Sequence, residues 1–162
     1  MNASDDVRIV RYDDRYAKDF ARLNYEWIER YFTVEDHDRE MLDAPAEYIV
    51  DKGGEIFFAL VGDEVAGTVA LIESGGKTFE LAKMAVSPKY QGKGIGDKLI
   101  DACVTYARKA GKRSIYLLSN IKLTPAISLY RKHGFRETPN DESSRYERVN
   151  IRMELAITAS DM

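Results

Sequence analysis

Two periods of apolar and polar residues divide the chain into predicted strands and predicted helices. Alternation at Val7–Tyr12 and from Tyr146 to Ile157 predicts half-buried strands near the two ends of the sequence. Apolar runs between turn residues predict an antiparallel meander of three strands, at residues 56–61, 65–72 and 78–86. Another apolar run predicts a strand at Ser114–Ser119.

Apolar residues recur at helical spacing in four other segments, which are residues 14–32, 35–42, 95–110 and 124–132. Thr124 is expected to cap the last of these helices, with Pro125 at its first position and Gly134 after its end. The order of elements is β-α-α-β-β-β-α-β-α-β. It predicts one α/β domain over residues 1–162, with a central mixed sheet of about six to seven strands flanked by about four helices.

Composition and charge narrow the class of protein. Hydrophobic residues make up 44% of the chain and charged residues 31%, which is typical of a globular domain. The net charge of −3 argues against a general nucleic-acid binder. Cys103 is the single cysteine, so no disulfide can form within the chain, and residues 1–6 do not resemble a signal peptide. We expect a cytoplasmic protein without nucleic-acid or membrane partners, and leave a homodimer open.

A glycine-rich segment joins the strand that ends at Val86 to the following helix. Glycines let the backbone approach an anion closely, and a helix N-terminus offers unpaired N–H groups to a pyrophosphate. The spacing Gly92-x-Gly94-x-Gly96 excludes a P-loop and the Gly-x-Gly-x-x-Gly dinucleotide fingerprint. Lys89, Lys93 and Lys98 add positive charge. The alternative is a flexible loop before a helix.

Three stretches together resemble one family. Gln91-x-x-Gly94-x-Gly96 follows Ala85-Val86-Ser87-Pro88, and residues 126–135 combine a Leu-Tyr helix with a Gly-Phe turn. With the order of elements, they resemble the GCN5-related N-acetyltransferase (GNAT) family over nearly the whole chain. The resemblance implies the family's fold and acetyl-coenzyme A as cosubstrate, with no metal.

In that family the loop amides bind the pyrophosphate of coenzyme A, and the preceding strand pairs with the pantetheine arm. Many members also have an asparagine where this chain has Leu123, and Asn120 is expected to replace it. The cofactor-binding residues implied by the resemblance are Met84, Ala85, Val86, Gln91, Gly92, Lys93, Gly94, Ile95, Gly96, Asp97, Asn120 and Ala126.

Glu80 is the candidate general base. Acetylation requires a neutral amine, and a partly buried carboxylate beside the acetyl group could take the proton. By simple alternation Glu80 shares a face with Ala82 and Met84, and it lies eleven residues before Gln91, where histone-type members place their base. The alternative is an outward-facing carboxylate paired with a lysine.

Tyr130 is the candidate general acid. It matches the tyrosine that in many members of the family donates to the coenzyme A sulfur, and a phenol can protonate a thiolate. The alternative is an aromatic packing residue beside Phe135. We expect a backbone N–H near Met84 or Ala85 to stabilise the oxyanion.

Other candidate site residues are better explained by packing in the core or by exposure to solvent. Cys103 falls on the apolar face of its helix, so we expect direct transfer in a ternary complex rather than an acetyl-cysteine intermediate. Glu35–Asp38 is expected to be a solvated helix start and not a metal site. Trp27, Tyr31 and Phe32 form a stripe typical of a core, although Glu26, Glu29, Tyr31 or Phe32 could meet the acceptor.

The sequence therefore predicts an acetyl-coenzyme A-dependent N-acetyltransferase acting on a primary amine of a small molecule or peptide. A non-catalytic acyl-coenzyme A sensor and a protein-modifying acetyltransferase stay open as alternatives. The acceptor itself cannot be deduced from these residues.

Overall fold

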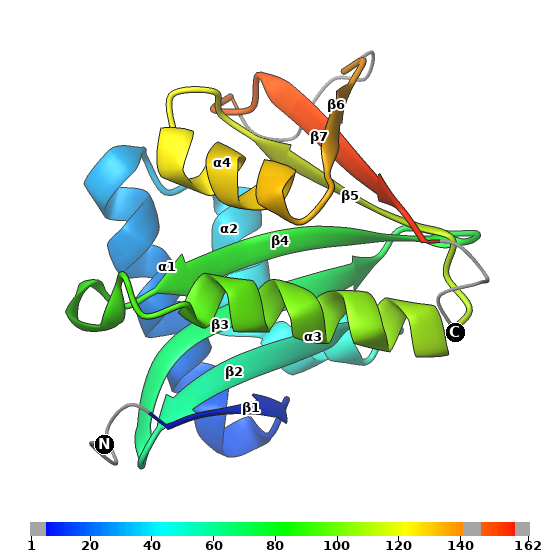
Figure 1. Ribbon diagram of the computed structural model, residues 1–162. Coiled ribbons are helices and arrows are strands. Elements are labelled where there is room, and N and C mark those ends of the chain that lie inside the picture. The colour runs from blue at the N-terminus through cyan, green and yellow to red at the C-terminus, as the bar shows by residue number, and fades with distance from the viewer. Residues whose placement is uncertain (1–5, 141–146, 158–162) are drawn as a thin grey trace.

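One mixed β-sheet forms the centre of the molecule. The computed structural model describes residues 6–140 and 147–157, and in these residues the sheet has seven strands in the order β1-β2-β3-β4-β5-β7-β6 (Figure 1). The strands are β1 (Val7–Arg11), β2 (Glu55–Val61), β3 (Glu64–Glu73), β4 (Thr78–Val86), β5 (Ser114–Ser119), β6 (Arg136–Thr138) and β7 (Ile151–Ala156). All neighbours are antiparallel except β4 and β5, which are parallel. The predicted mixed sheet is confirmed.

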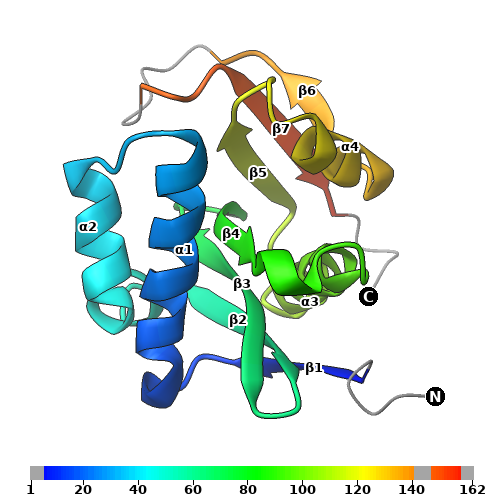
Figure 2. The ribbon, with the colours of Figure 1, turned by 90° about the vertical axis from the view of Figure 1, so that its left-hand side faces the viewer.

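Helices cover both faces of this sheet (Figure 2). They are α1 (Ala17–Tyr31), α2 (Asp36–Asp43), α3 (Ile95–Lys109) and α4 (Thr124–Lys132). Helices α1 and α2 pack on one face, and α3 and α4 on the other. Short helical turns at Asp14–Tyr16, Ala46–Val50 and Pro88–Tyr90 complete the described elements.

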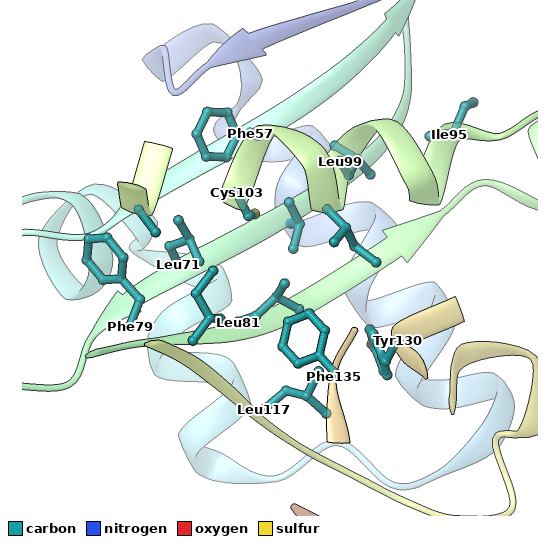
Figure 3. Packing of buried hydrophobic residues seen from close by; sticks show 14 of the residues in the cluster. Phe57, Leu71, Phe79, Leu81, Ile95, Leu99, Cys103, Leu117, Tyr130 and Phe135 are labelled. Carbon is teal, nitrogen blue, oxygen red and sulfur yellow. The ribbon is translucent and has the colours of Figure 1, made fainter. Parts of the chain in front are cut away.

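Two hydrophobic clusters result, one on each face. Every residue of β2 is buried; Phe57 belongs to the cluster under α3, while Phe58 belongs to the cluster under α1 and α2. In Figure 3, Leu99 and Cys103 of α3 lie over the sheet beside Leu71. Full burial of a leucine side chain such as Leu99 contributes about 1.5–3 kcal/mol to the free energy of folding. Cys103 is fully buried, as expected from its position on the apolar helix face.

The ends of several elements differ from their predicted positions. The first helix begins with a 3₁₀ turn, because the Asp13 carboxylate accepts from Arg15 N. Thr124 is a first-turn residue rather than the cap, since the helix begins with the bond from Ile127 N to Leu123 O. The last strand begins at Ile151, and Tyr146 lies outside the described residues. Strand β6 was not predicted, because three residues are too few to show a period.

A β-bulge interrupts β4. Thr68 pairs with Ala85 and Ala70 with Ala82, so β4 has one residue more than β3 between these pairs. Lys83 lies in the bulge. Its φ of 55° is a left-handed conformation that is uncommon for a residue other than glycine. A bulge reverses the alternation of side chains beyond it.

The bulge corrects one expectation about the site. Glu80 pairs with Ile72, which packs against the cluster under α1, whereas Met84 packs against the cluster under α3. Glu80 and Met84 therefore do not share a face of the sheet. Ala85 takes the place of Met84 on the α1 face, where it is buried.

The parallel strands β4 and β5 separate after a short paired segment. Their pairing extends only from Thr78–Ser114 to Glu80–Tyr116, although both strands continue beyond it. Figure 1 shows the two strands diverging toward their carboxyl ends. Separation of two central strands exposes their facing backbone edges and opens a space inside the sheet.

A buried carboxylate joins three elements beside this space. Asp38 of α2 is fully buried; it accepts from Lys83 Nζ at 2.6 Å and from Arg148 Nη2 at 2.7 Å. Arg148 also donates to Glu35 at 3.2 Å. Burial by itself would raise the pKa of Asp38, but the hydrogen bonds from Arg148 and Lys83 outweigh it and lower that pKa to about 2. Glu35–Asp38 is thus not a wholly solvated helix start, because Asp38 ties α2 to the bulge and to the segment before β7.

Replacing this carboxylate should destabilise the protein strongly. Asp38→Asn removes the carboxylate that binds buried Lys83 and one of the two carboxylates that pair with Arg148, for which we expect a loss of about 3–5 kcal/mol in the free energy of unfolding. The folded-state pKa lies below the unfolded value, so the ionised carboxylate stabilises the fold above about pH 4, and this contribution is lost as the pH falls toward 2. Urea unfolding of both proteins between pH 7 and pH 2 measures it.

Asp36→Asn is the matched control, because Asp36 lies in the same helical turn with a side chain that is 99% exposed and paired only with Arg39 among the described residues. Its replacement should change the free energy of unfolding by less than about 1 kcal/mol. Equal losses for Asp36→Asn and Asp38→Asn, or a difference between parent and Asp38→Asn that persists unchanged at pH 2, would contradict the assignment.

Candidate active site

A cavity of about 780 Å³ occupies the space between the diverging strands. Its walls come from β4 beyond Phe79, the end of β5, the glycine loop with the start of α3, one side of α4, α1, and the segment before β7. One cavity therefore contacts both the loop expected to bind pyrophosphate and the residues expected to act on the acetyl group.

The glycine loop has the backbone of an anion-binding site. Gly92 and Gly94 have φ values of 79° and 76°, which other residues adopt only with strain. The first hydrogen bond within α3 runs from Lys98 N to Gly94 O, so the amides of residues 95–97 precede the helical ladder. These amides lie at the positive end of the helix dipole, where a phosphate group binds favourably.

Gly96 allows the Leu129 side chain of α4 to pack closely against the start of α3. A Cβ atom at this position would lie 2.8 Å from Leu129 Cδ2 of α4, which is closer than real contacts allow. Gly96 therefore lets α3 and α4 approach each other at the cavity wall. Leu129 lines the same cavity.

Two charged residues near the loop, Lys89 and Asp97, are paired within the protein. Lys89 pairs with Glu64 at 3.2 Å, and Lys93 is exposed and does not line the cavity. The Asp97 carboxylate binds Lys132 Nζ at 2.9 Å and His133 Nε2 at 2.8 Å, and these hydrogen bonds lower the pKa of Asp97. Asp97 lines the cavity, but its side chain mainly holds α3 to α4.

Strand β4 presents an open edge to the cavity. Met84 and Val86 line it, whereas the side chain of Ala85 is buried on the α1 face and does not. Beyond Glu80 this edge has no pairing with β5, so its backbone N–H and C=O groups can pair with an extended ligand as a further strand would.

Tyr130 lines the cavity, and Figure 3 shows it beside Phe135 of the hydrophobic core. It is 8% exposed, with its ring 6.0 Å from that of Phe135. Burial, together with nearby Cys103, raises the pKa of Tyr130 to about 12, so the phenol stays protonated at neutral pH. Among the described residues the Tyr130 hydroxyl has no hydrogen-bond partner, which leaves it available to a ligand.

Glu80 lines the cavity near the point where the strands separate. It is 6% exposed, and Tyr116 Oη donates to Glu80 Oε1 at 3.3 Å. Lys83, which lies in the bulge, also lines the cavity. Burial lowers the pKa of Lys83, while the charges of Asp38 and Glu80 oppose that decrease.

Residues in the first turn of α4 and just before it line the cavity. Ala126, Leu123 and Asn120 all line the cavity. The Asn120 side chain donates to Arg148 O at 2.8 Å and accepts from Lys122 N at 2.9 Å. Its amide therefore shapes the loop at the cavity wall.

The aromatic stripe of α1 lines the cavity. Trp27, Tyr31 and Phe32 contribute to this wall, with the Trp27 ring 5.4 Å from Tyr31 and 6.1 Å from Phe32. The stripe is core in part: Trp27 and Phe32 pack against the cluster under α1 and α2 and also line the cavity, whereas Tyr31 is 43% exposed. Helical periodicity does not distinguish a core from a pocket lining. Glu26 and Glu29 do not line the cavity.

Lys83 and Arg148 are wall residues that the sequence did not indicate. Both contact the cavity, and both are tied to Asp38. The only sign of Lys83 in the sequence is a charged residue within an apolar strand. A bulge has no periodic pattern, so the sequence does not show that this residue lies at one.

In the part of the chain that the structure describes, no group of three or more His, Cys, Asp or Glu side chains is placed to hold a metal ion. No described helix has the length and apolar character needed to cross a membrane.

Sequence relatives share part of their length with this chain. YvbK of Bacillus subtilis, an uncharacterized N-acetyltransferase, is 34% identical over 103 residues, which cover 62% of this chain and 66% of that protein. N-acetyltransferase 8 of Rattus norvegicus is 29% identical over 61% of this chain and 47% of its own length. The chain thus spans just under two thirds of the bacterial relative and about half of the rat one.

Solved structures share the fold over nearly the whole chain. A GNAT-family acetyltransferase of Staphylococcus aureus superposes with a TM-score of 0.85 at 21% identity, covering 94% of this chain and 100% of that one. The yncA structure of Salmonella typhimurium contains acetyl-CoA and has a TM-score of 0.72 at 20% identity, covering 96% and 94%. Spermidine N-acetyltransferase of Vibrio cholerae, in complex with CoA and spermine, has a TM-score of 0.72 at 20% identity, covering 93% and 95%.

The family model extends from the acceptor side of the cavity to the Gly-Phe turn. It matches residues 21–135, which include α1, the glycine loop and α4. The match confirms the resemblance seen in the loop and in the Leu-Tyr helix. This chain belongs to the acetyltransferase (GNAT) family.

Proposed function

We propose that this protein is an acetyl-coenzyme A-dependent N-acetyltransferase that transfers the acetyl group directly to a primary amine of a small molecule or peptide. The observation that supports this most is that one cavity joins the glycine loop, the open edge of β4, Glu80 and Tyr130. The pyrophosphate would bind the loop amides, and the pantetheine arm would pair with β4 between the diverging strands. Acetyl-CoA in the Salmonella structure and CoA in the Vibrio structure support the same ligand here.

The two candidate catalytic groups suit the two proton transfers of the reaction. Glu80 would accept a proton from the ammonium group, and the amine would then attack the thioester carbonyl. Collapse of the tetrahedral intermediate breaks the carbon–sulfur bond, and the Tyr130 hydroxyl would donate to the departing thiolate. The second proton of the attacking nitrogen would then return to the Tyr130 oxygen, which leaves a neutral amide and a neutral phenol. Fully buried Cys103, whose thiol pKa is raised by burial, is unsuited to form an acetyl intermediate.

The acceptor side favours a cationic amine. Trp27 and Tyr31 present aromatic surface, which attracts an ammonium group, and Glu80 adds a carboxylate in the same cavity. The Vibrio neighbour binds spermine, and a polyamine is therefore a useful first member of a substrate panel.

Binding and turnover together test the proposed function. Calorimetry with acetyl-coenzyme A measures cofactor affinity, and thiol release across polyamines, amino acids and peptides measures transfer. We expect binding, and thiol release that depends on an amine. Absence of both would refute the proposal; binding without release for any amine would favour an acyl-coenzyme A sensor.

Gly92→Ala should weaken coenzyme A binding about tenfold, because a Cβ at a left-handed position costs about 1–2 kcal/mol and favours a different loop conformation. Calorimetry measures the change. Gly62→Ala is the control, since Gly62 also has a positive φ and open space around it but lies in the β2–β3 turn away from the cavity. Equal affinity of the two variants would argue against pyrophosphate binding at the loop.

Tyr130→Phe should lower kcat about 100-fold while the affinity for coenzyme A stays near that of the parent, because only the donor to the thiolate is removed. Steady-state thiol release and calorimetry separate the two effects. Tyr106→Phe is the control, because Tyr106 packs against Phe57 and Phe79 on the remote side of α3. A parent-like kcat in Tyr130→Phe would remove this residue as the general acid.

Glu80→Gln should lower kcat about 100-fold at neutral pH. The loss should diminish as the pH approaches the amine pKa of about 10, because the acceptor then loses its proton without a base. A pH–rate profile of parent and variant measures this. A profile that runs parallel to the parent's at every pH would exclude Glu80 as the base.

A further inference from the structure

A hydrogen-bonded chain leads from Glu80 to the protein surface. Tyr116 Oη donates to Glu80 Oε1 at 3.3 Å, and Tyr116 Oη lies 3.0 Å from Ser74 Oγ. Glu80 is 6% exposed and Tyr116 is half-buried, whereas Ser74 is exposed at the end of β3. Three oxygen atoms thus connect the cavity to solvent without passing through its mouth.

The position of this chain follows from the sheet. Glu80 and Tyr116 are the last residues paired between β4 and β5 before the strands separate. Tyr116 therefore lies at the closed end of the opening, where the sheet is still continuous. Ser74 lies in the connection between β3 and β4, at the opposite end of β4 from the glycine loop. A bound cofactor and acceptor that fill the cavity would leave this route open.

We propose that Tyr116 and Ser74 form a proton relay that carries the proton taken by Glu80 from the acceptor amine to solvent. This inference rests on the proposed function, and it adds Tyr116 as a residue that receives and passes on the proton. Without an exit, a buried base that has accepted a proton cannot act in the next turnover.

Each step of the relay breaks one O–H bond and forms another. The ammonium N–H bond breaks and Glu80 becomes a carboxylic acid. The Glu80 proton then passes to Tyr116 Oη as the phenolic proton passes to Ser74 Oγ, and the Ser74 proton passes to a water molecule or a buffer base. The Tyr116 hydroxyl, which donates to the ionised Glu80, turns toward Ser74 before this shift; the contact between Ser74 and Tyr116 allows either oxygen to donate, as this rotation requires.

Charged groups on the neighbouring elements surround this route. Lys83 of β4 lies on the cavity side of Glu80, with Asp38 of α2 and Arg148 behind it. Arg152 of β7 lies over the Tyr116 ring, 4.7 Å from its centroid. These cations disfavour a net positive charge on the relay, so a concerted shift along neutral hydroxyl groups is preferred over a protonated intermediate.

Removal of the phenolic oxygen should slow proton release. Tyr116→Phe should lower kcat about tenfold at neutral pH in a weak buffer. Small bases such as imidazole should then restore the rate in proportion to their concentration, whereas the parent should be insensitive to buffer concentration. Ser74→Ala should show a smaller loss with the same buffer dependence, and Ser74→Thr should restore the parent rate, because it keeps a hydroxyl group.

Two comparisons keep the relay separable from the rest of the mechanism. Tyr106→Phe, which removes a phenolic hydroxyl on α3 with no hydrogen bond among the described residues, should leave kcat and buffer dependence unchanged. Glu80→Gln measures the base itself. Unfolding midpoints near that of the parent show that each variant is folded.

The outcomes are distinct. If Glu80→Gln lowers kcat but Tyr116→Phe retains the parent rate, the relay is refuted and the proposed function stands. A slow Tyr116→Phe whose rate does not rise with imidazole would make Tyr116 a positioning residue only and also refutes the relay. If the parent transfers acetyl groups to no amine, the relay and the proposed function fail together.

Discussion

The separation of β4 from β5 is the constraint on which the rest of this structure depends. The two strands pair over only three residues each, from Thr78 to Glu80 on β4, and the cavity begins where that pairing ends. The bulge at Lys83 places an extra residue in β4 at this point and reverses the direction of the side chains that follow. A continuous, regularly paired sheet would bury these backbone groups in its own ladder. Because the ladder stops, β4 can offer an open edge to an extended ligand.

Electrostatics hold the bulge in place. Lys83 adopts a left-handed backbone conformation, which costs free energy, and its ammonium group is almost fully buried. Asp38 compensates for both by binding Lys83 and Arg148, and a carboxylate between two cations is stable in a site where a lone charge would not be. The same interaction fixes α2 and the segment before β7 around the acceptor side of the cavity. The hydrophobic clusters above and below the sheet supply the bulk of the burial, while this network sets the shape of the site.

The cavity has two ends with different physical character. At one end the backbone has the features that suit an anion, namely left-handed glycines and the amides that precede the helical ladder of α3. At the other end side chains dominate: aromatic rings from α1, the carboxylate of Glu80, and the hydroxyl of Tyr130. In the proposed reaction the donor would bind at the first end and the acceptor at the second.

Local sequence determined the elements whose causes are local. The bounds of the strand Thr78–Val86, the helix after Gly94 and the Gly134 stop are set by apolar runs, by periodicity and by the conformations open to glycine, and the structure has them where predicted. Tyr130 and Glu80 were found by motif and spacing, and both line the cavity. Only the tertiary structure decided that the side chains of Met84 and Glu80 lie on different faces of the sheet, that Asp38 is buried, and that Trp27 lines the cavity. Each of these depends on contacts between distant segments. The face of Met84 depends on the pairing of Ala70 with Ala82, and the burial of Asp38 depends on Lys83 and Arg148. The position of Trp27 depends on the packing of α1 beside β4. Such pairings arise from burial and charge compensation between segments far apart in the chain, and no period within one segment encodes them.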